Sequence, residues 1–301
     1  MANIEPDKRD LRPGYIPPSG PNPNLTYEQL WGENSPVLWR IHVRERVERI
    51  PEQDRQTIEH MLFRLIKSHS FGYTLFGAKP ISCTALALPN SEYVSRYNLD
   101  IPSTCDWHVW EKYAHQFEHD NIAMRTAGAS QHTGNAQIIM INIPQLAATI
   151  EAHQDFFISR LGQDLGNKDR IIAAILNGQP IEEVLGNHMA LVGILFGFGK
   201  NNSLRYEELE RDGANAAQRN RELPLIHIKG APLGMALGEP PQISHTGVGF
   251  RGDPHSEESL SIWNRLVAAA SAIEELLKSQ NFLEDFLGIY MGIYGRGKSY
   301  I

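Results

Sequence analysis

The chain has 301 residues, with 28 basic against 35 acidic side chains and a formal net charge of −7. Hydrophobic residues make up 42% and charged residues 21%, which is typical of a soluble globular protein and excludes collagen-like, coiled-coil and wholly disordered chains. The acidic excess supplies no broad positive surface, so we expect no nucleic-acid partner.

The cysteine content and the apolar segments indicate in which cellular compartment the protein is expected. Cys83 and Cys105 are too few for a disulfide framework and form no CxxC pair, so we expect two reduced, structural thiols. The first ten residues are polar, and the longest apolar run, 189–198, has about half the length that spans a bilayer. We expect no membrane span and, by default, a cytoplasmic protein, although a trimmed signal sequence would leave the same chain.

The N-terminal quarter begins with a proline-rich segment. Residues 1–24 contain six prolines and few apolar side chains, which predicts an extended or disordered arm ahead of a single domain over 25–301. Apolar residues at helical spacing then predict a helix over 37–50 and a second helix after Pro51. The second helix has one apolar face, made of Ile58, Met61, Leu62, Leu65 and Ile66.

The middle of the chain mixes strands with helices. Aromatic residues and glycines over 71–88 predict two strands joined by a turn, and 121–126 with 136–143 predict another strand pair. Between these pairs, 103–120 has a helical pattern with its aromatic residues on one face. A further helix is predicted to begin at Pro144 and to reach Leu161.

The C-terminal half is mainly helical. Helices are predicted over 169–176, 206–221, 255–277 and 282–290, with short strands over 226–250. The run 189–198 is apolar on every side, which is typical of a buried helix. This mixed order favours an α+β fold, a small, mostly antiparallel sheet surrounded by helices, with one central buried apolar helix.

Three glycine motifs resemble nucleotide-binding loops. The GxxxxGKS match over 292–299 has only two residues after it and therefore no helix to hold a phosphate. The GxGxxG match over 247–252 precedes a predicted helix whose first residues are acidic. With Asp253 as its N-cap and Pro254 at its first position, this segment is typical of an ordinary helix start. Over 197–200, Gly199 suits a helix C-cap with Lys200 beside it. We therefore interpret all three as structural bends and expect no cofactor.

The segment from His115 to His119 spells HxxEH. On a helix these two histidines lie one turn apart and can ligate Zn²⁺, while Glu118 can act as the base that deprotonates a bound water. This spelling resembles the inverted motif of zinc peptidases, in which a distal Glu completes the site. The nearest candidates here are Glu182 and Glu183. The alternative is that these side chains form the solvated face of the helix.

A thiol nucleophile is a further possibility. Cys105 and His108 are three residues apart near a helix start, where the helix dipole favours a thiolate. Pairing of Cys105 with His132, His227 or His245 is an alternative that spacing does not decide.

Two segments carry a family resemblance. HMLFRLIKSHSFGYTLFGAKPIS at 60–82 and GILFGFGKNNS at 193–203 resemble a protein group of chlamydia-like and other intracellular bacteria for which no activity is known. The resemblance implies a bacterial, host-associated protein and transfers no active residue.

Two classes of function remain. We favour a non-catalytic binding protein whose partner is an unknown protein or a small molecule, because each enzymatic motif lacks part of its context. The alternative is a hydrolase, using zinc through His115, Glu118 and His119 or using the thiol of Cys105.

Overall fold

The computed structural model describes residues 36–87, 101–128, 136–228, 232–233, 242–243 and 248–291. The predicted arm over 1–24 and the glycine motif over 292–299 lie outside the described residues, as do His132 and His245. The division of the chain at residues 24 and 25 stays a prediction.

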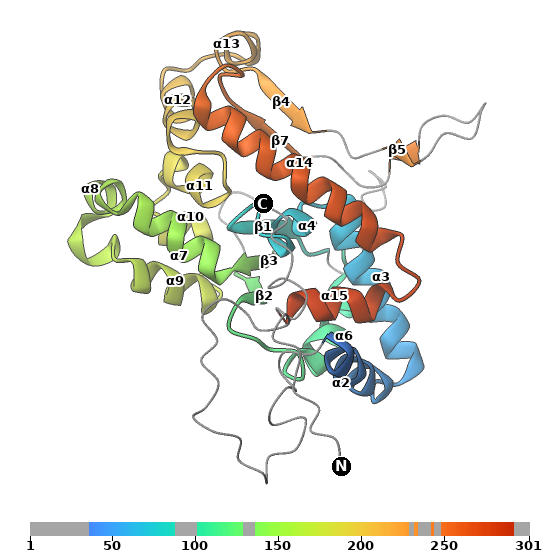
Figure 1. Ribbon diagram of the computed structural model, residues 1–301. Helices are drawn as coiled ribbons and strands as arrows, with labels where there is room; N and C mark the ends of the chain where they lie inside the picture. The colour runs from blue at the N-terminus through green and yellow to red at the C-terminus, as the bar shows by residue number, and fades with distance from the viewer. Residues whose placement is uncertain are drawn as a thin grey trace, which may run out of the picture.

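Helices dominate the described residues (Figure 1). The helices are α2 (Pro36–Glu48), α3 (Glu52–Ser68), α4 (Phe71–Leu75), α6 (Thr104–Ala114), α7 (Ile143–Ala152), α8 (Gln154–Leu165), α9 (Lys168–Leu176), α10 (Ile181–Val184), α11 (Met189–Leu195), α12 (Lys200–Arg211), α13 (Ala216–Glu222), α14 (Glu257–Leu277) and α15 (Phe282–Tyr290). The strands are β1 (Ile81–Ala85), β2 (Ile122–Ala127), β3 (Gln137–Asn142), β4 (Leu225–Ile228), β5 (Pro232–Leu233), β6 (Gln242–Ile243) and β7 (Val248–Arg251).

The largest sheet has three antiparallel strands in the order β1-β3-β2. Its middle strand, β3, is buried on both faces, because successive side chains of a strand point to opposite sides. Ile138 and Met140 belong to one hydrophobic core, and Ile139 and Ile141 belong to the other. The sheet therefore separates two cores.

Each core is closed by its own helices. The first core contains side chains of α2, α3, α4, α6, α14 and α15. The second contains side chains of α7, α8, α9, α10 and α11. In Figure 1 the green and yellow helices α7–α11 lie to the left of the sheet, and α3, α6 and α15 lie to its right. This arrangement confirms the α+β class with a small antiparallel sheet surrounded by helices.

The apolar run 189–198 forms the short helix α11. Five of its residues are buried, namely Ala190, Leu191, Val192, Ile194 and Leu195, so the predicted buried apolar helix is present. The helix ends at Leu195, three residues earlier than predicted, and Met189 at its start is 42% exposed. α11 contributes to the second core, on one face of the sheet.

The segment 71–75 is a helix, and the strand predicted there is wrong. All five residues of α4 are buried, so aromatic side chains that favour strands pack on every side of a helical turn. A Cβ on Gly72 would lie 2.6 Å from Ile273 Cγ1 of α14, so glycine permits this close approach. The chain then turns at Gly77, whose φ is +77°, and enters β1 as predicted.

Three predicted helices have different boundaries. The helix predicted over 103–120 ends at Ala114, the helix over 144–161 is two helices that meet at His153, and the helix over 206–221 is divided between α12 and α13 at Gly213. Gly213 has a φ of +68°, which ends a helix because other residues adopt this conformation at a cost.

Two predicted caps are also wrong. Gly199 precedes α12 as its N-cap, so Lys200 begins a helix rather than following one. Helix α14 begins at Glu257 behind the N-cap Ser256, whose Oγ accepts from the backbone N–H of Ser259 at 3.1 Å. The carboxylate of Asp253 instead accepts from the N–H of His255 at 2.9 Å, which forms a local turn ahead of the helix.

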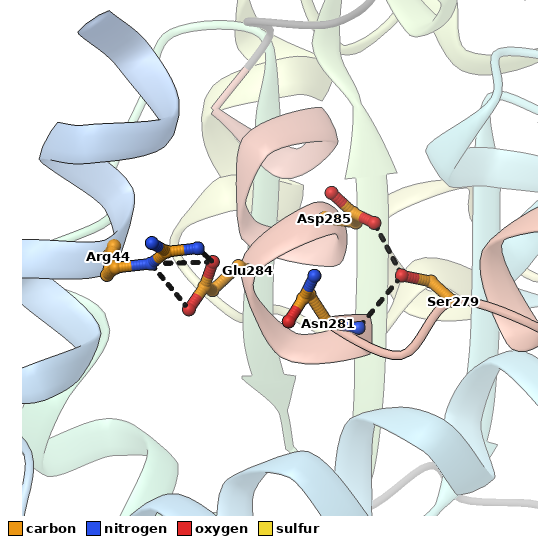
Figure 2. A network of polar contacts seen from close by, with 5 residues as sticks. All are labelled: Arg44, Ser279, Asn281, Glu284 and Asp285. Atoms are coloured by element: carbon orange, nitrogen blue, oxygen red, sulfur yellow. Dashed lines mark hydrogen bonds and ion pairs between the residues drawn. The ribbon is translucent and has the colours of Figure 1, made fainter. Parts of the chain in front are cut away.

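Helices α2 and α15, far apart in the sequence, are joined by a polar contact (Figure 2). Arg44 on α2 donates from Nη2 to Glu284 Oε2 on α15 at 3.2 Å. At the start of α15, Ser279 Oγ accepts from the backbone N–H of Asn281 at 3.0 Å and donates to Asp285 at 2.6 Å.

Within the part of the chain that the structure describes, no helix is both long and apolar enough to cross a membrane.

Candidate binding site

A pocket with a volume of about 450 Å³ lies between α6, β2 and the turn after α9. Three segments line it: Trp107, Trp110, Glu111, Ala114, His115 and Glu118 from α6 and the turn after it, Met124, Arg125 and Thr126 from β2, and Leu176, Asn177 and Gly178. This volume suits a small organic molecule.

Helix α6 provides one wall of the pocket because of its spacing and its N-terminal cap. Ser103 Oγ accepts from the N–H of Asp106 at 3.1 Å, and the Asp106 carboxylate accepts from the N–H of Ser103 at 3.4 Å. This capping box fixes where the helix begins. Trp110 and Glu111 follow Trp107 by three and four residues, so all three lie on the side of the helix that meets the pocket.

The two tryptophans leave buried donors without acceptors. Trp107 is 2% and Trp110 1% exposed, and the indole Nε1–H of each has no hydrogen-bond partner among the described residues. An unpaired buried donor costs about 1–3 kcal/mol. Both residues line the pocket, but their Nε1 atoms are buried behind its surface, so the pocket meets other atoms of the two indoles.

The ring of Trp110 is fixed by its aromatic neighbours. It stacks on Phe117 with ring centres 6.2 Å apart and meets the ring of Tyr290 edge-on at 5.9 Å. The Tyr290 hydroxyl accepts from the N–H of Met124 on β2 at 3.1 Å, and burial raises the pKa of Tyr290 to about 12. The aromatic contacts therefore hold α6 and β2 in place on either side of the pocket.

The outer part of the pocket is charged. Arg125 Nη2 and Glu118 Oε1 form an ion pair of 3.2 Å between side chains that are 38% and 55% exposed. Such exposed pairs contribute little to stability and open readily for a ligand. Glu111 has no ion-pair partner among the described residues, so the two carboxylates of Glu111 and Glu118 outnumber the single guanidinium of Arg125.

Gly178 closes the third side. It has a φ of +78°, and a Cβ there would lie 2.7 Å from the Thr126 carbonyl oxygen on β2. Its own carbonyl accepts from the N–H of Gly128 at 3.0 Å. Glycine therefore lets the turn after α9 lie directly against the strand.

Of the predicted site residues, the structure brings Glu118 and His115 to the pocket. His119 does not line it, and its Nδ1 accepts from the N–H of Asn121 at 3.3 Å. Because α6 ends at Ala114, the two histidines do not lie one helical turn apart, so the helical premise of the zinc prediction is wrong. The described residues contain no group of three or more His, Cys, Asp or Glu arranged to hold a metal ion. Zinc binding itself stays a prediction.

The predicted thiol site lies elsewhere on α6. Cys105 and His108 are exposed and are not among the residues that line the pocket. His227 is exposed on β4. Catalysis by Cys105 is a prediction that the structure does not test.

The glycine motif over 247–252 does not have the geometry of a dinucleotide loop. Residues 248–251 form β7, which pairs antiparallel with β4, whereas that loop joins a strand directly to a helix. Gly252 packs against Asn202 and Ser259, since a Cβ there would lie 2.6 Å from Ser259 Oγ.

The sequence reasoning missed Trp107, Arg125, Asn177 and Gly178 as pocket residues. Trp107 lies three residues before Trp110 in the segment 103–120, whose aromatic residues were expected on one face but were not assigned to a site. A signal was present in the indole N–H groups, because buried tryptophans need an acceptor. The contribution of the turn after α9 depends on tertiary packing and has no local signal.

The chain was compared with protein-family models, with curated proteins and with solved structures, and none of the three comparisons gave a match.

Proposed function

We propose that the protein binds a small organic molecule in the pocket between α6, β2 and the turn after α9. The observation that carries the proposal is the pocket itself, which has a volume of about 450 Å³ and which the tryptophans Trp107 and Trp110 line beside the exposed ion pair of Glu118 and Arg125. A cavity of this size with aromatic surface and a few polar groups is typical of a small-molecule site.

The lining also indicates the chemistry of the occupant. Ala114, Met124 and Leu176 offer apolar surface, and Trp107 and Trp110 add aromatic surface. The net negative charge of Glu111, Glu118 and Arg125 disfavours an anion. The ligand is therefore neutral or cationic, with an apolar or aromatic part.

The first prediction concerns these two indoles. In protein labelled with ¹⁵N-tryptophan, neutral fragments that carry amide or hydroxyl groups, such as N-acetylglucosamine and nicotinamide, are expected to shift the indole cross-peaks of Trp107 and Trp110. Trp107→Phe and Trp110→Phe assign the peaks and weaken binding about fivefold each, because each removes aromatic contact with the ligand of roughly 1 kcal/mol.

Trp263→Phe is the matched control, since Trp263 is exposed on α14. Benzoate and phosphate serve as anionic test compounds, and they are expected to bind more weakly than the neutral fragments. The proposal fails if a library of several hundred such neutral fragments at millimolar concentration leaves both cross-peaks in place.

A further inference from the structure

Four polar side chains meet where α4 joins β1, close to the residues that follow α11. They come from the N-cap of α4, from α4, from the loop after it and from β1, and they are Ser70, Thr74, Lys79 and Ser82. Lys79 Nζ lies 3.4 Å from Ser70 Oγ, Ser70 Oγ lies 3.1 Å from Ser82 Oγ, and Ser82 Oγ lies 2.7 Å from Thr74 Oγ1. None of the four lines the pocket described above.

The hydrogen bonds of this cluster fix the direction of each hydroxyl. Ser82 Oγ donates to the carbonyl oxygen of Ser70 at 2.8 Å, which uses its single proton. It then accepts from both Ser70 and Thr74, which fills its two lone pairs. Ser70 Oγ accepts from Lys79 and donates to Ser82, so one lone pair of Ser70 has no partner within the cluster.

The members differ in exposure. Ser82 and Thr74 are fully buried and Lys79 is 4% exposed, whereas Ser70 is half-buried. The serine is therefore the member that an outside molecule can reach, while the amine behind it is shielded from water.

Lys79 is buried without a counter-ion. Among the described residues it has no ion-pair partner, and its Nζ lies over the rings of Phe196 and Phe198 at 5.5 and 5.2 Å. Burial lowers the pKa of Lys79 from its usual 10.5 to about 8. A substantial share of the amine is then neutral in weakly alkaline solution.

We propose that Ser70 is a nucleophile for acyl transfer and that Lys79 is its general base. A serine activated by a lysine is a known variant of the serine–histidine arrangement. The half-buried, apolar rings of Phe196 and Phe198 beside Lys79 favour an uncharged carboxylic ester or amide with an apolar acyl group.

The step balances with water as the only co-reactant. When Lys79 loses its proton, the Ser70 hydroxyl turns from Ser82 Oγ to the neutral Nζ. Ser70 Oγ then forms a bond to the carbonyl carbon while its proton moves to Nζ. The tetrahedral adduct expels the alcohol or amine, which takes the proton from Lys79. Water attacks the acyl-serine in the same way and releases the carboxylic acid. Ser82 holds the Ser70 side chain beside Lys79 and does not touch the substrate.

Other titratable groups lie near this cluster. Cys83 on β1 acts electrostatically on Lys79, and burial raises the pKa of the Cys83 thiol to about 11. Glu182 on α10 acts on Cys83 in turn, and its Oε2 is buried without a partner among the described residues. His69 precedes Ser70, and its Nδ1 lies 3.1 Å from Thr84 Oγ1.

The test uses a fluorophosphonate, which forms a bond to an activated serine oxygen as fluoride leaves and the serine proton passes to the base. Intact-mass and peptide mass spectrometry are expected to place the adduct on Ser70. The rate constant is expected to rise with pH around a midpoint near 8, because only neutral Lys79 accepts the proton. Hydrolysis of p-nitrophenyl acetate is expected to follow the same profile.

Two variants and one control separate catalysis from folding. Ser70→Ala abolishes the adduct, and Lys79→Met lowers its rate constant by about 10²-fold or more, as expected for loss of a general base. Lys67→Met is the matched control, because Lys67 is exposed on α3 and its Nζ also lies over a phenylalanine ring, 5.8 Å from the centre of Phe63.

Circular dichroism checks the fold of each variant. Absence of an adduct at pH 9 in the folded wild type overturns the proposal, as does equal labelling of K79M and K67M. If K79M does not fold, the wild-type profile decides, because a rate that rises in proportion to hydroxide up to pH 10 is incompatible with a base that titrates near 8.

Discussion

Gly178 and Gly213 have similar backbone conformations in different surroundings. Their φ angles are +78° and +68°, but a Cβ on Gly178 would lie 2.7 Å from a backbone oxygen, while nothing lies within 4 Å of one on Gly213. Left-handed backbone costs a residue with a Cβ roughly 1–2 kcal/mol. Gly213→Ala is therefore expected to lower the free energy of unfolding by about 1 kcal/mol and Gly178→Ala by about 3 or more.

Urea unfolding of the two variants measures this difference, with Gly213→Ala as the control for conformation alone. G178A also moves the turn after α9 away from β2, so fragment binding in the pocket is expected to weaken. Equal losses of stability in both variants would show that the contact with Thr126 relaxes without cost.

At the scale of single residues, the sequence predicts which side chains can take part in a site better than it predicts where they lie in the fold. His115 and Glu118 were recognised by type, and both reach the pocket, although through a turn rather than the helix that the HxxEH spelling predicted. The unpaired state of the Trp107 and Trp110 N–H groups follows from what packs around them, which no local pattern encodes. Lys79 likewise looks like an ordinary surface lysine until the fold buries it.

At the scale of elements, α6 shows what a cap contributes. The capping box of Ser103 and Asp106 begins the helix, and Asp106 also pairs with Arg64 of α3 at 3.0 Å. Ser103→Ala removes one cap bond and is expected to lower the free energy of unfolding by about 1 kcal/mol. Because the cap sets the start of the helix that holds both pocket tryptophans, fragment affinity is expected to fall with it.

Chemical denaturation with fragment titration of the same sample checks this expectation. Asn215→Ala is the matched control, since Asn215 caps α13 by accepting from the N–H of Gln218 at 2.9 Å and lies far along the chain from the pocket. It should lose similar stability and no affinity. A loss of affinity in N215A would mean that stability alone controls binding.

Helices whose apolar residues recur at a clear helical spacing were predicted well. Elements whose conformation depends on tertiary packing were not. Helix α3 has the predicted apolar face, with Ile58, Leu62 and Ile66 all buried. Helix α4 was predicted as a strand, because it carries the aromatic residues Phe71 and Tyr73 beside a glycine, and its five residues are too few to show a helical period. Its helical state depends on contacts with the sheet and with α14, which are distant in the sequence.

At the scale of the whole molecule, β3 connects the two cores. Ile139 packs into the core closed by α7–α11, while the tryptophans Trp107 and Trp110 belong to the other core. Ile139→Ala removes buried methyl groups and is expected to cost about 2–5 kcal/mol. Because the same strand supports both cores, tryptophan fluorescence should report this loss from the opposite face of the sheet.

Equilibrium unfolding followed by fluorescence and by far-ultraviolet circular dichroism tests the coupling. Coincident transitions at a lower denaturant midpoint are expected for I139A. The control is Ile41→Ala, a change at an exposed residue of α2 that should leave the midpoint near that of the wild type. If the fluorescence midpoint of I139A stays unchanged while the dichroism transition moves, the cores unfold independently.

The fold class was predictable because strands and helices alternate irregularly along the chain, which disfavours a parallel sheet. The separation into two cores was not predictable, since it requires knowing that β3 is the central strand. The sequence of β3, QIIMIN, shows a continuous apolar run that is consistent with burial on both faces, but it does not say which helices cover each face.

The start of α12 has one more consequence. Both oxygens of the Glu258 carboxylate accept backbone N–H groups there, from Asn201 at 3.1 Å and from Asn202 at 3.0 Å. In nucleotide-binding proteins, backbone N–H groups at the start of a helix that follows a glycine-rich loop bind a phosphate in this way. The Glu258 carboxylate belongs to the same chain and therefore has a far higher effective concentration than a free anion. It occupies these backbone N–H groups in place of a phosphate. Gly199 lets the Glu258 side chain lie against the start of α12, since a Cβ there would collide with it, whereas a Cβ on Gly197 would lie 3.2 Å from Pro80. A sequence that resembles a nucleotide-binding loop thus joins α12 to α14 through Glu258.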